Sequence, residues 1–249
     1  MHMKNKIEIY GIRSIIEAIE SSEDIYKVYL IKSNLQKSGL FKSLVTLVEN
    51  NNIKYSFVPK EKFKKYSDKN HQGAVAVLSP IKLLSIEELL SVTFDKKSPI
   101  TYLLLDGITD VRNFGAIIRT AVASSVDGII IPQNNSAPVN SDVVKASSGG
   151  VFKIPIARVN NIKDAILHLN SLEINIISLS EKGEKTIYDY NFKETNAIIM
   201  GSEEKGISKS VLSLSNEILR IPINSKIDSL NVSSAFSVVS YEIIRQRNF

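Results

Sequence analysis

Hydrophobic positions follow two different patterns along this chain, and the change falls near residue 100. Before it, helical stripes such as Ile15, Ile16 and Ile19 alternate with short β-branched and aromatic runs. Such stripes predict helices that bury one face, and the runs between them predict strands. We therefore expect a small α/β unit with helices at 13–21 and 41–48 and strands at 27–31, 55–58 and 73–78.

After residue 100 the apolar residues form continuous runs that end in Gly, Asp or Pro. Runs without alternation are typical of parallel strands that are covered on both faces. They predict an α/β sheet of about five or six strands, with ligands bound at the carboxyl ends of the strands. The expected strands are 103–105, 129–131, 176–179, 198–200 and 218–221, and the expected helices are 114–123, 162–169 and 232–244.

The change of pattern also predicts the domain limits. We expect a first domain at 1–80, a connection at 81–98 and a second domain at 99–249. The net charge of +5 divides in the same way, because residues 1–98 carry 16 Lys and Arg against 11 Asp and Glu. Residues 99–249 carry 15 of each. An excess of positive charge in the first domain suits a polyanionic partner.

Cysteine is absent from the 249 residues, which excludes disulfides and thiolate metal sites. The three histidines lie far apart and show no ligand spacing, so we expect no metal. No apolar run reaches the roughly 18 residues needed to cross a bilayer. The start of the chain shows no apolar core of a signal peptide. A cytoplasmic protein is the expectation.

The densest basic stretch has aromatic residues between its lysines. Basic side chains with aromatics between them suit phosphates and unstacked bases. On this feature alone, a lysine-rich helix face in solvent is the favoured interpretation. The RNA-binding candidates in this stretch are Lys60, Lys62, Lys64 and Lys65, with Phe63, Tyr66 and Lys69 beside them.

The first of three polar motifs follows the strand expected at 103–105 and spans residues 105–121. A helix is expected to begin near Asn113, which would then serve as its N-cap. Arg119 lies about 240° farther around that helix, so the two side chains need not share a face. By spacing alone, a structural role for this motif is favoured.

The second motif, residues 198–208, is a strand followed by the glycine-containing turn Gly201-Ser202-Glu203-Glu204-Lys205-Gly206. Its spacing fits neither the dinucleotide fingerprint nor the P-loop. Two adjacent glutamates also disfavour a phosphate and suit a cationic or neutral ligand. A polar turn without function remains an equal alternative.

The third motif, residues 220–235, runs from Pro222 into a helix start that is rich in small polar residues. Pro222 removes one hydrogen-bond donor and so fits the end of a strand. Small side chains allow backbone amides and hydroxyls to face a ligand, although capping a helix requires only one of them. These small residues are Ser229, Asn231, Ser233 and Ser234.

In order and spacing, the three motifs resemble those of the SpoU/TrmH family of RNA 2′-O-methyltransferases. Asn113, Gly115 and Arg119-Thr120-Ala121 are similar to the family's first motif, and 229–233 to its Ser-Leu-Asn-Val-Ser. Tyr10-Gly11 and His71-Gln72-Gly73 resemble the RNA-binding domain of the RlmB-like members. The chain departs from the family at Glu204, Ile223 and Ser225, which usually are Gly, Met and Gly. The first two lie beside the expected cofactor pocket.

This resemblance implies a trefoil-knotted α/β methyltransferase domain, preceded by a small α/β RNA-binding domain that resembles a ribosomal protein. It also implies S-adenosyl-L-methionine as cofactor, a homodimer, and a guanosine of 23S rRNA as target. A tRNA ribose methyltransferase and a non-catalytic RNA-binding protein remain alternatives, and a dinucleotide-dependent enzyme is a distant third. The implied catalytic residues are Arg119, Asn113, Glu203, Asn231 and Ser233, and the implied cofactor-binding residues are Leu179, Ser180, Gly201, Ile221 and Leu230.

Overall fold

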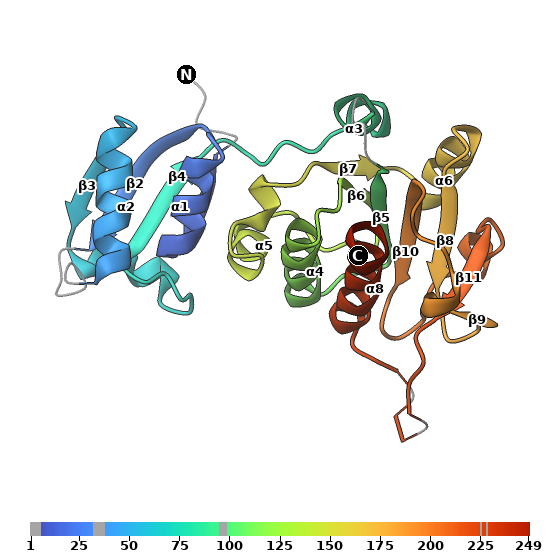
Figure 1. Cartoon of the computed structure of the whole chain (residues 1–249). Helices are drawn as coiled ribbons and strands as arrows, with labels where there is room; N and C mark the ends of the chain where they lie inside the picture. The colour runs from blue at the N-terminus through green and yellow to red at the C-terminus, as the bar shows by residue number, and fades with distance from the viewer. Residues whose placement is uncertain (1–5, 32–37, 95–98, 225, 228) are drawn as a thin grey trace. The chain divides into compact units, whose positions relative to one another are not determined.

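The computed structural model describes residues 6–31, 38–94, 99–224, 226–227 and 229–249. The chain divides into two compact units, of which unit 1 comprises residues up to 82 together with 139–153 (Figure 1). Unit 2 comprises residues 83–138 and 154–249.

The part of unit 1 up to residue 82 contains a four-stranded sheet and, among the described residues, two α-helices. The strands are β1 (Ile7–Tyr10), β4 (Ala74–Leu78), β2 (Ile25–Ile31) and β3 (Tyr55–Val58), in this spatial order. Strand β4 pairs antiparallel with both β1 and β2, whereas β3 is parallel to β2. The helices α1 (Ile12–Glu20) and α2 (Gly39–Asn50) pack against each other, and α1 also contacts β1 and β4.

Alternation along these strands separates two faces of the sheet. Ile9, Val28 and Leu30 are fully buried, whereas their neighbours Glu8 and Tyr29 point to the opposite face. Part of that second face is covered by the 3₁₀ helix η2 (Lys60–Tyr66), whose Phe63 packs into a small apolar cluster. The cluster contains Tyr10, Ile31, Phe63 and Val75, with Tyr29, Val58 and Tyr66 packed against it.

Unit 2 is a seven-stranded sheet in which every pairing is parallel, so the expected α/β class is confirmed. Five of its strands correspond to the continuous apolar runs. The other two are β7, which has an exposed Arg158 in its middle, and the two-residue β9. The spatial order is β7 (Ile156–Val159), β6 (Gly128–Pro132), β5 (Thr101–Asp106), β10 (Asn196–Gly201), β8 (Asn175–Leu179), β11 (Glu217–Arg220), β9 (Lys185–Thr186).

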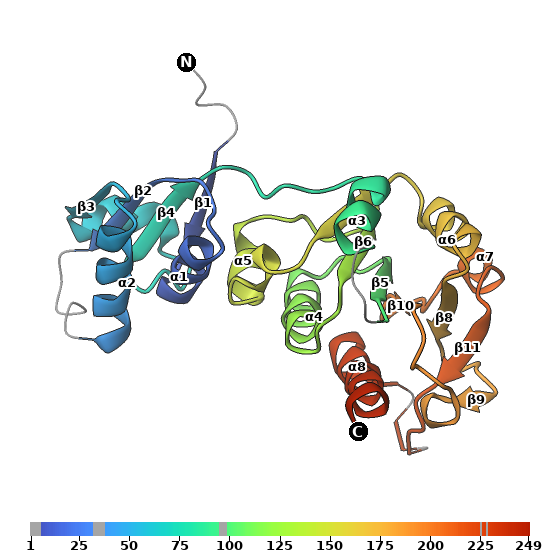
Figure 2. The same ribbon diagram turned by 45° about the horizontal axis from the view of Figure 1, so that its top comes forward.

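Helices cover both faces of this sheet (Figures 1 and 2). On one face α4 (Val111–Ala123) packs against α8 (Val232–Asn248), and α8 contacts β10. On the other face the apolar core joins the strands to α3 (Ile86–Thr93), α6 (Ile162–Ser171) and α7 (Lys209–Leu212). Helix α3 lies within the predicted connection 81–98, yet its Ile86, Leu89 and Leu90 belong to this core.

Residues 139–153 fall in the predicted second domain, but their contacts group them with unit 1. They form the helix α5 (Ser141–Ala146) and the 3₁₀ helix η3 (Gly150–Phe152). Helix α5 contacts β1, and Lys153 forms an ion pair with Glu17 on α1. The sequence pattern predicted no helix here, because the six residues of α5 are too few to show a helical stripe.

One local expectation is wrong. The helix α4 begins at Val111, and its N-cap is Asp110 rather than Asn113. The Asp110 carboxylate accepts a hydrogen bond from the backbone N–H of Asn113 at 2.8 Å. Asn113 is therefore the third residue of the helix, and its side chain is available for another partner.

Candidate active site

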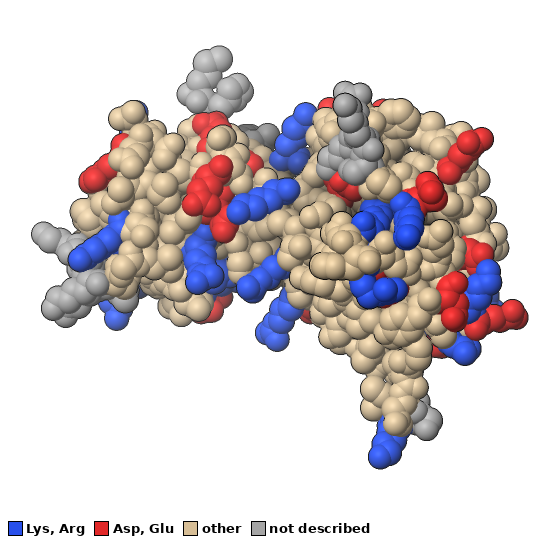
Figure 3. Space-filling view, in the orientation of Figure 1, with Lys and Arg blue, Asp and Glu red and all other residues tan. Residues whose placement is uncertain are grey.

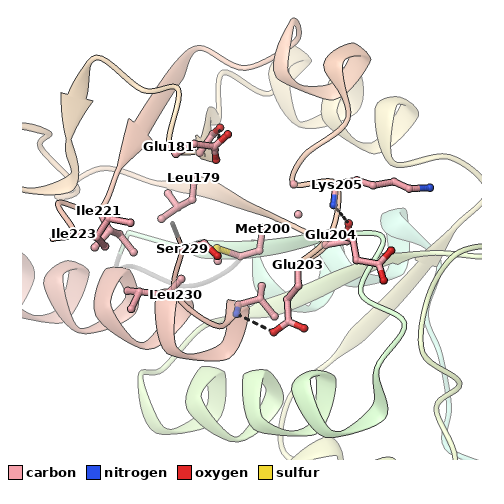
Figure 4. A pocket seen from close by; sticks show the side chains of 16 residues that line it. Leu179, Glu181, Met200, Glu203, Glu204, Lys205, Ile221, Ile223, Ser229 and Leu230 are labelled. Carbon is pink, nitrogen blue, oxygen red and sulfur yellow. Dashed lines mark hydrogen bonds between the residues drawn. The ribbon is translucent and has the colours of Figure 1, made fainter. Parts of the chain in front are cut away.

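A pocket of about 430 Å³ lies at the carboxyl ends of β8, β10 and β11. Its walls come from the segments that follow these strands and from the start of α8 (Figure 4). In a parallel sheet the carboxyl ends of neighbouring strands meet at one edge, which explains why these segments converge. All five cofactor candidates line this pocket, namely Leu179, Ser180, Gly201, Ile221 and Leu230.

The wall beside β10 is a tight turn that leaves no room for a side chain at Gly201. A Cβ atom there would overlap the backbone of Gly206 and Ile207. The turn is closed by a hydrogen bond from the N–H of Gly206 to the carbonyl of Ser202 at 2.8 Å. Gly206 has a positive φ of 63°, which favours glycine. The glycines of the second motif therefore bring backbone directly over the strand end.

The pocket combines an apolar interior with an acidic rim. Figure 4 shows the apolar side chains from three strand ends and the α8 start around one space. Three glutamates, Glu181, Glu203 and Glu204, line it against the single cation Lys205. Its charge therefore suits a cationic ligand with an apolar ring, as the adjacent glutamates of the second motif suggest. The apolar side chains are those of Leu179, Met200, Ile221, Ile223, Leu230, Val232 and Ala235.

Asn231 connects the three motifs by hydrogen bonds. Its Nδ2 group donates to the Oδ1 atom of Asn113 at 3.0 Å and also to the Oε1 atom of Glu203. Its Oδ1 atom caps α8 by accepting from the N–H of Ser233 at 3.0 Å and from the Ser233 hydroxyl at 2.6 Å. Glu203 also accepts from the N–H of Val232 at 3.5 Å. Four of the five catalytic candidates thus form one network.

A second cavity of about 280 Å³ adjoins this network. It shares Glu203 and Val232 with the first pocket, and Asn113 lies in its wall. Asp110 and Asn135 also line this cavity. Sequence reasoning did not select these last two residues, because a helix cap and a loop asparagine carry no signal of their own.

Arg119 is separate from the network. It is exposed on α4, and within the described residues it makes no hydrogen bond or ion pair and lines neither cavity. Its neighbour Thr120 faces α8, where its hydroxyl lies 3.3 Å from that of Ser237. A guanidinium that is free of protein partners can bind an external anion.

The four lysine candidates lie on η2, in unit 1. Lys60, Lys62 and Lys64 are exposed, whereas Lys65 donates to both oxygens of Glu8 at 2.8 Å. On the face that Figure 3 shows, basic and acidic side chains are interspersed over both units.

No group of three potential metal ligands occurs among the described residues. In the same part of the chain, no helix is long and apolar enough to span a membrane.

Comparison with known proteins matches both parts of the chain to domains of RNA methyltransferases. Residues 100–241 match the SpoU rRNA Methylase family, and residues 9–84 match the RNA 2′-O ribose methyltransferase substrate-binding family. The chain is 33% identical to a protein of Staphylococcus saprophyticus named as a TrmH family tRNA/rRNA methyltransferase. That match covers 98% of this chain and 97% of the relative. A similarly named Bacillus subtilis protein, YacO, is 27% identical over 96% of each chain.

Solved structures with the same fold include the SpoU methyltransferase AviRb from Streptomyces viridochromogenes in complex with AdoMet. It superposes with a TM-score of 0.81 at 21% identity, covering 97% of this chain and 90% of AviRb. An AdoMet-bound rRNA methyltransferase from Sinorhizobium meliloti has a TM-score of 0.78 at 22% identity, covering 97% and 87%. These matches confirm the family inferred from the three motifs: the chain belongs to the SpoU family of RNA 2′-O-methyltransferases.

Proposed function

We propose that this enzyme transfers a methyl group from S-adenosylmethionine to the ribose 2′-hydroxyl of a guanosine in 23S rRNA. The observation that carries this proposal is the convergence of the three motifs at one edge of the sheet. There the first pocket, the Asn231 network and the second cavity adjoin one another. Such a pair of adjoining cavities suits a cofactor and a nucleotide that must react with each other.

The first pocket fits the cofactor of this family. When bound, S-adenosylmethionine supplies an electrophilic methyl group on a cationic sulfonium. Leu179, Ile221 and Leu230 offer apolar contacts for an adenine ring, and the turn from Gly201 offers backbone groups for its polar edges. The excess of glutamates over lysine around the rim attracts the positive charges of the ligand.

The chain's own residues would orient the target ribose and hold its phosphate. Asn113 and Glu203, which are held together through Asn231, face the second cavity, where the nucleotide would bind. A guanidinium is protonated at any ordinary pH and is a poor base. We therefore assign Arg119 as a clamp on the phosphate beside the target, with that phosphate accepting the proton from the 2′-hydroxyl.

The homodimer that the family resemblance implies would use the exposed side of α8. The apolar stripe of α8 formed by Val232, Phe236, Val239 and Ile243 is buried within its own chain. The opposite side of α8 carries Tyr241, which is 54% exposed and available to a second copy. Light scattering at working concentration is the test, and a monomer would contradict this assignment. The trefoil knot, the cytoplasmic location and the domain limits 1–80, 81–98 and 99–249 stay predictions.

The decisive experiment incubates the enzyme with labelled S-adenosylmethionine and either 23S rRNA or total tRNA from a strain that lacks the modification. Nuclease mapping and mass spectrometry then locate the labelled ribose. Label on a guanosine of 23S rRNA is the expected result. Label on tRNA alone would replace the substrate, and methylation of a base atom would overturn the reaction type. No label on any RNA would favour the non-catalytic alternative.

A further inference from the structure

The open face of the unit 1 sheet carries two adjoining hollows, of about 900 and 300 Å³. Their shared lining comes from three strands and from η2, which are far apart in the sequence. We call these two hollows together the tyrosine groove. The residues common to both are Glu8, Tyr29, Lys65, Tyr66 and Val77.

Lysine ammonium groups lie over two tyrosine rings of the tyrosine groove, so a stacked base would use the other face of the ring or displace the ammonium. The ammonium of Lys65 lies 4.8 Å from the ring centroid of Tyr66, and that of Lys27 lies 5.1 Å from the ring of Tyr29. Lys62, which makes no ion pair within the described residues, lines the smaller hollow. A nucleobase stacks on an aromatic face, and its phosphates need cations a few ångströms away. Both requirements are met on this one surface.

Glu8 adds a specific acceptor between these groups. Its carboxylate accepts from the Tyr66 hydroxyl at 2.6 Å and from Lys65 at 2.8 Å. Although partial burial raises the pKa of Glu8, the hydrogen bonds from Lys65 and Tyr66 lower it below its ordinary value. Glu8 is therefore ionised at neutral pH and acts only as an acceptor. Lys65 donates to both oxygens of Glu8. A base edge that presents two adjacent donors would therefore bind this carboxylate in place of Lys65, whose ammonium would turn to a phosphate.

We propose that the tyrosine groove binds one unpaired guanine of the RNA substrate, stacked on Tyr66 or Tyr29 and read by the carboxylate of Glu8. Guanine presents its N1–H and N2–H groups side by side on its Watson–Crick edge, whereas uracil presents one N–H. Recognition of single-stranded RNA commonly combines such stacking with hydrogen bonds to that edge. This inference rests on the proposed function, since it assumes an RNA substrate. The guanine is a second nucleotide, because the motif pocket lies in unit 2.

The test uses the full-length protein and fluorescein-labelled oligouridines of equal length, with or without one central guanosine. Fluorescence anisotropy at fixed salt gives both affinities. The wild type should prefer the guanosine oligomer by about 10-fold or more, as expected for one stacked and hydrogen-bonded base. Tyr66→Ala should lose most of that affinity, whereas Tyr66→Phe should keep the stacking. Glu8→Gln should remove the preference for guanine over uracil.

Matched controls separate this site from nonspecific effects. Tyr188 in unit 2 is 56% exposed, so Tyr188→Ala should change neither affinity. Melting temperatures establish that each variant is folded, and the ratio of the two affinities does not depend on total binding strength. Unchanged ratios in both Tyr66→Ala and Glu8→Gln would overturn the proposal. If the wild type methylates RNA but shows no guanine preference, the groove fails and the proposed function stands. A guanine preference without any methyl transfer would support the groove and contradict the proposed function.

Discussion

The side chain of Asn231 joins that of Asn113 across 118 positions of the chain, with its Nδ2 atom 3.0 Å from the Asn113 Oδ1. The same asparagine caps α8 through its other side-chain atom. One residue therefore both starts the last helix and connects it to the first motif. Its two functions use different atoms, so mutation can separate them.

We expect Asn231→Ala to lower both stability and activity. Loss of the cap should cost roughly 1 kcal/mol of the free energy of unfolding. Loss of the Nδ2 group also frees Asn113 and Glu203, which should reduce methyl transfer. Asn231→Ser is the matched variant, because serine keeps the cap but cannot reach across to Asn113. Thermal unfolding and methyl transfer are measured for both. Full activity in the serine variant would remove the connection from the mechanism.

Gly201→Ala should weaken cofactor binding by about 10-fold or more, because the new Cβ must displace the turn at Gly206 and Ile207. Calorimetry with S-adenosylhomocysteine measures this effect. Gly39→Ala is the control, since a Cβ at Gly39 in α2 meets nothing within 4 Å. That variant should bind normally and be equally or slightly more stable. Wild-type affinity in Gly201→Ala would contradict the assigned pocket wall.

Arg119→Ala should reduce methyl transfer by about two orders of magnitude or more. Because Arg119 is exposed and makes no bond within the described residues, stability should not change. Arg119→Lys should also be poor, since a single ammonium cannot reproduce the planar fork of a guanidinium. Arg112→Ala provides an exposed arginine on the same helix as control. Retained activity in Arg119→Ala would exclude the phosphate clamp.

Glu242 should contribute to the acid sensitivity of stability. It is 6% exposed on α8, and two hydrogen bonds of 2.8 Å from Arg245 lower the pKa of its carboxyl. A lowered folded-state pKa gives stability that is complete above the unfolded value of 4.5 and is lost as pH falls through the folded value. Since Arg245 is largely exposed to water, we expect about 1 kcal/mol. Glu242→Gln should therefore be less stable at pH 7, and the difference from the wild type should disappear as pH falls below the lowered folded-state pKa of Glu242. Melting temperatures of both proteins are measured across this pH range. A difference between them that is the same at every pH would exclude a role for the ionisation of Glu242.

Five of the seven strands of unit 2 could be predicted because they form continuous apolar runs, whereas β7 and β9 do not. Strand β1 (Ile7–Tyr10) was missed, since its half-buried alternation with Glu8 spans only four residues. The helix start at Val111 was missed because Asp110 and Asn113 are both capping residues, and sequence alone did not favour Asp110.

The pocket could be predicted from the sequence, whereas the tyrosine groove could not. The pocket residues were predicted through the order of the motifs. The groove brings together Glu8, Tyr29 and Tyr66, whose proximity depends on strand pairing and on the position of η2. The lysines and aromatics at 60–69 were compatible with RNA binding, although a solvated helix face was favoured on this feature alone. The pattern did not distinguish Lys62 and Lys65, which line the groove, from Lys60 and Lys64.

The pocket at the strand ends is built from several separate segments between Leu179 and Ala235, and each of them supplies one wall. Local opening of any one of these segments would remove part of the binding site. A bound ligand therefore raises the free energy of opening of each segment. Amide hydrogen exchange should therefore slow together at 179–181, 200–206 and 229–235 when the cofactor analogue is added. Exchange within β1 to β4 should not respond. The slowing at each stretch would give the part of the binding free energy that is lost when that stretch opens.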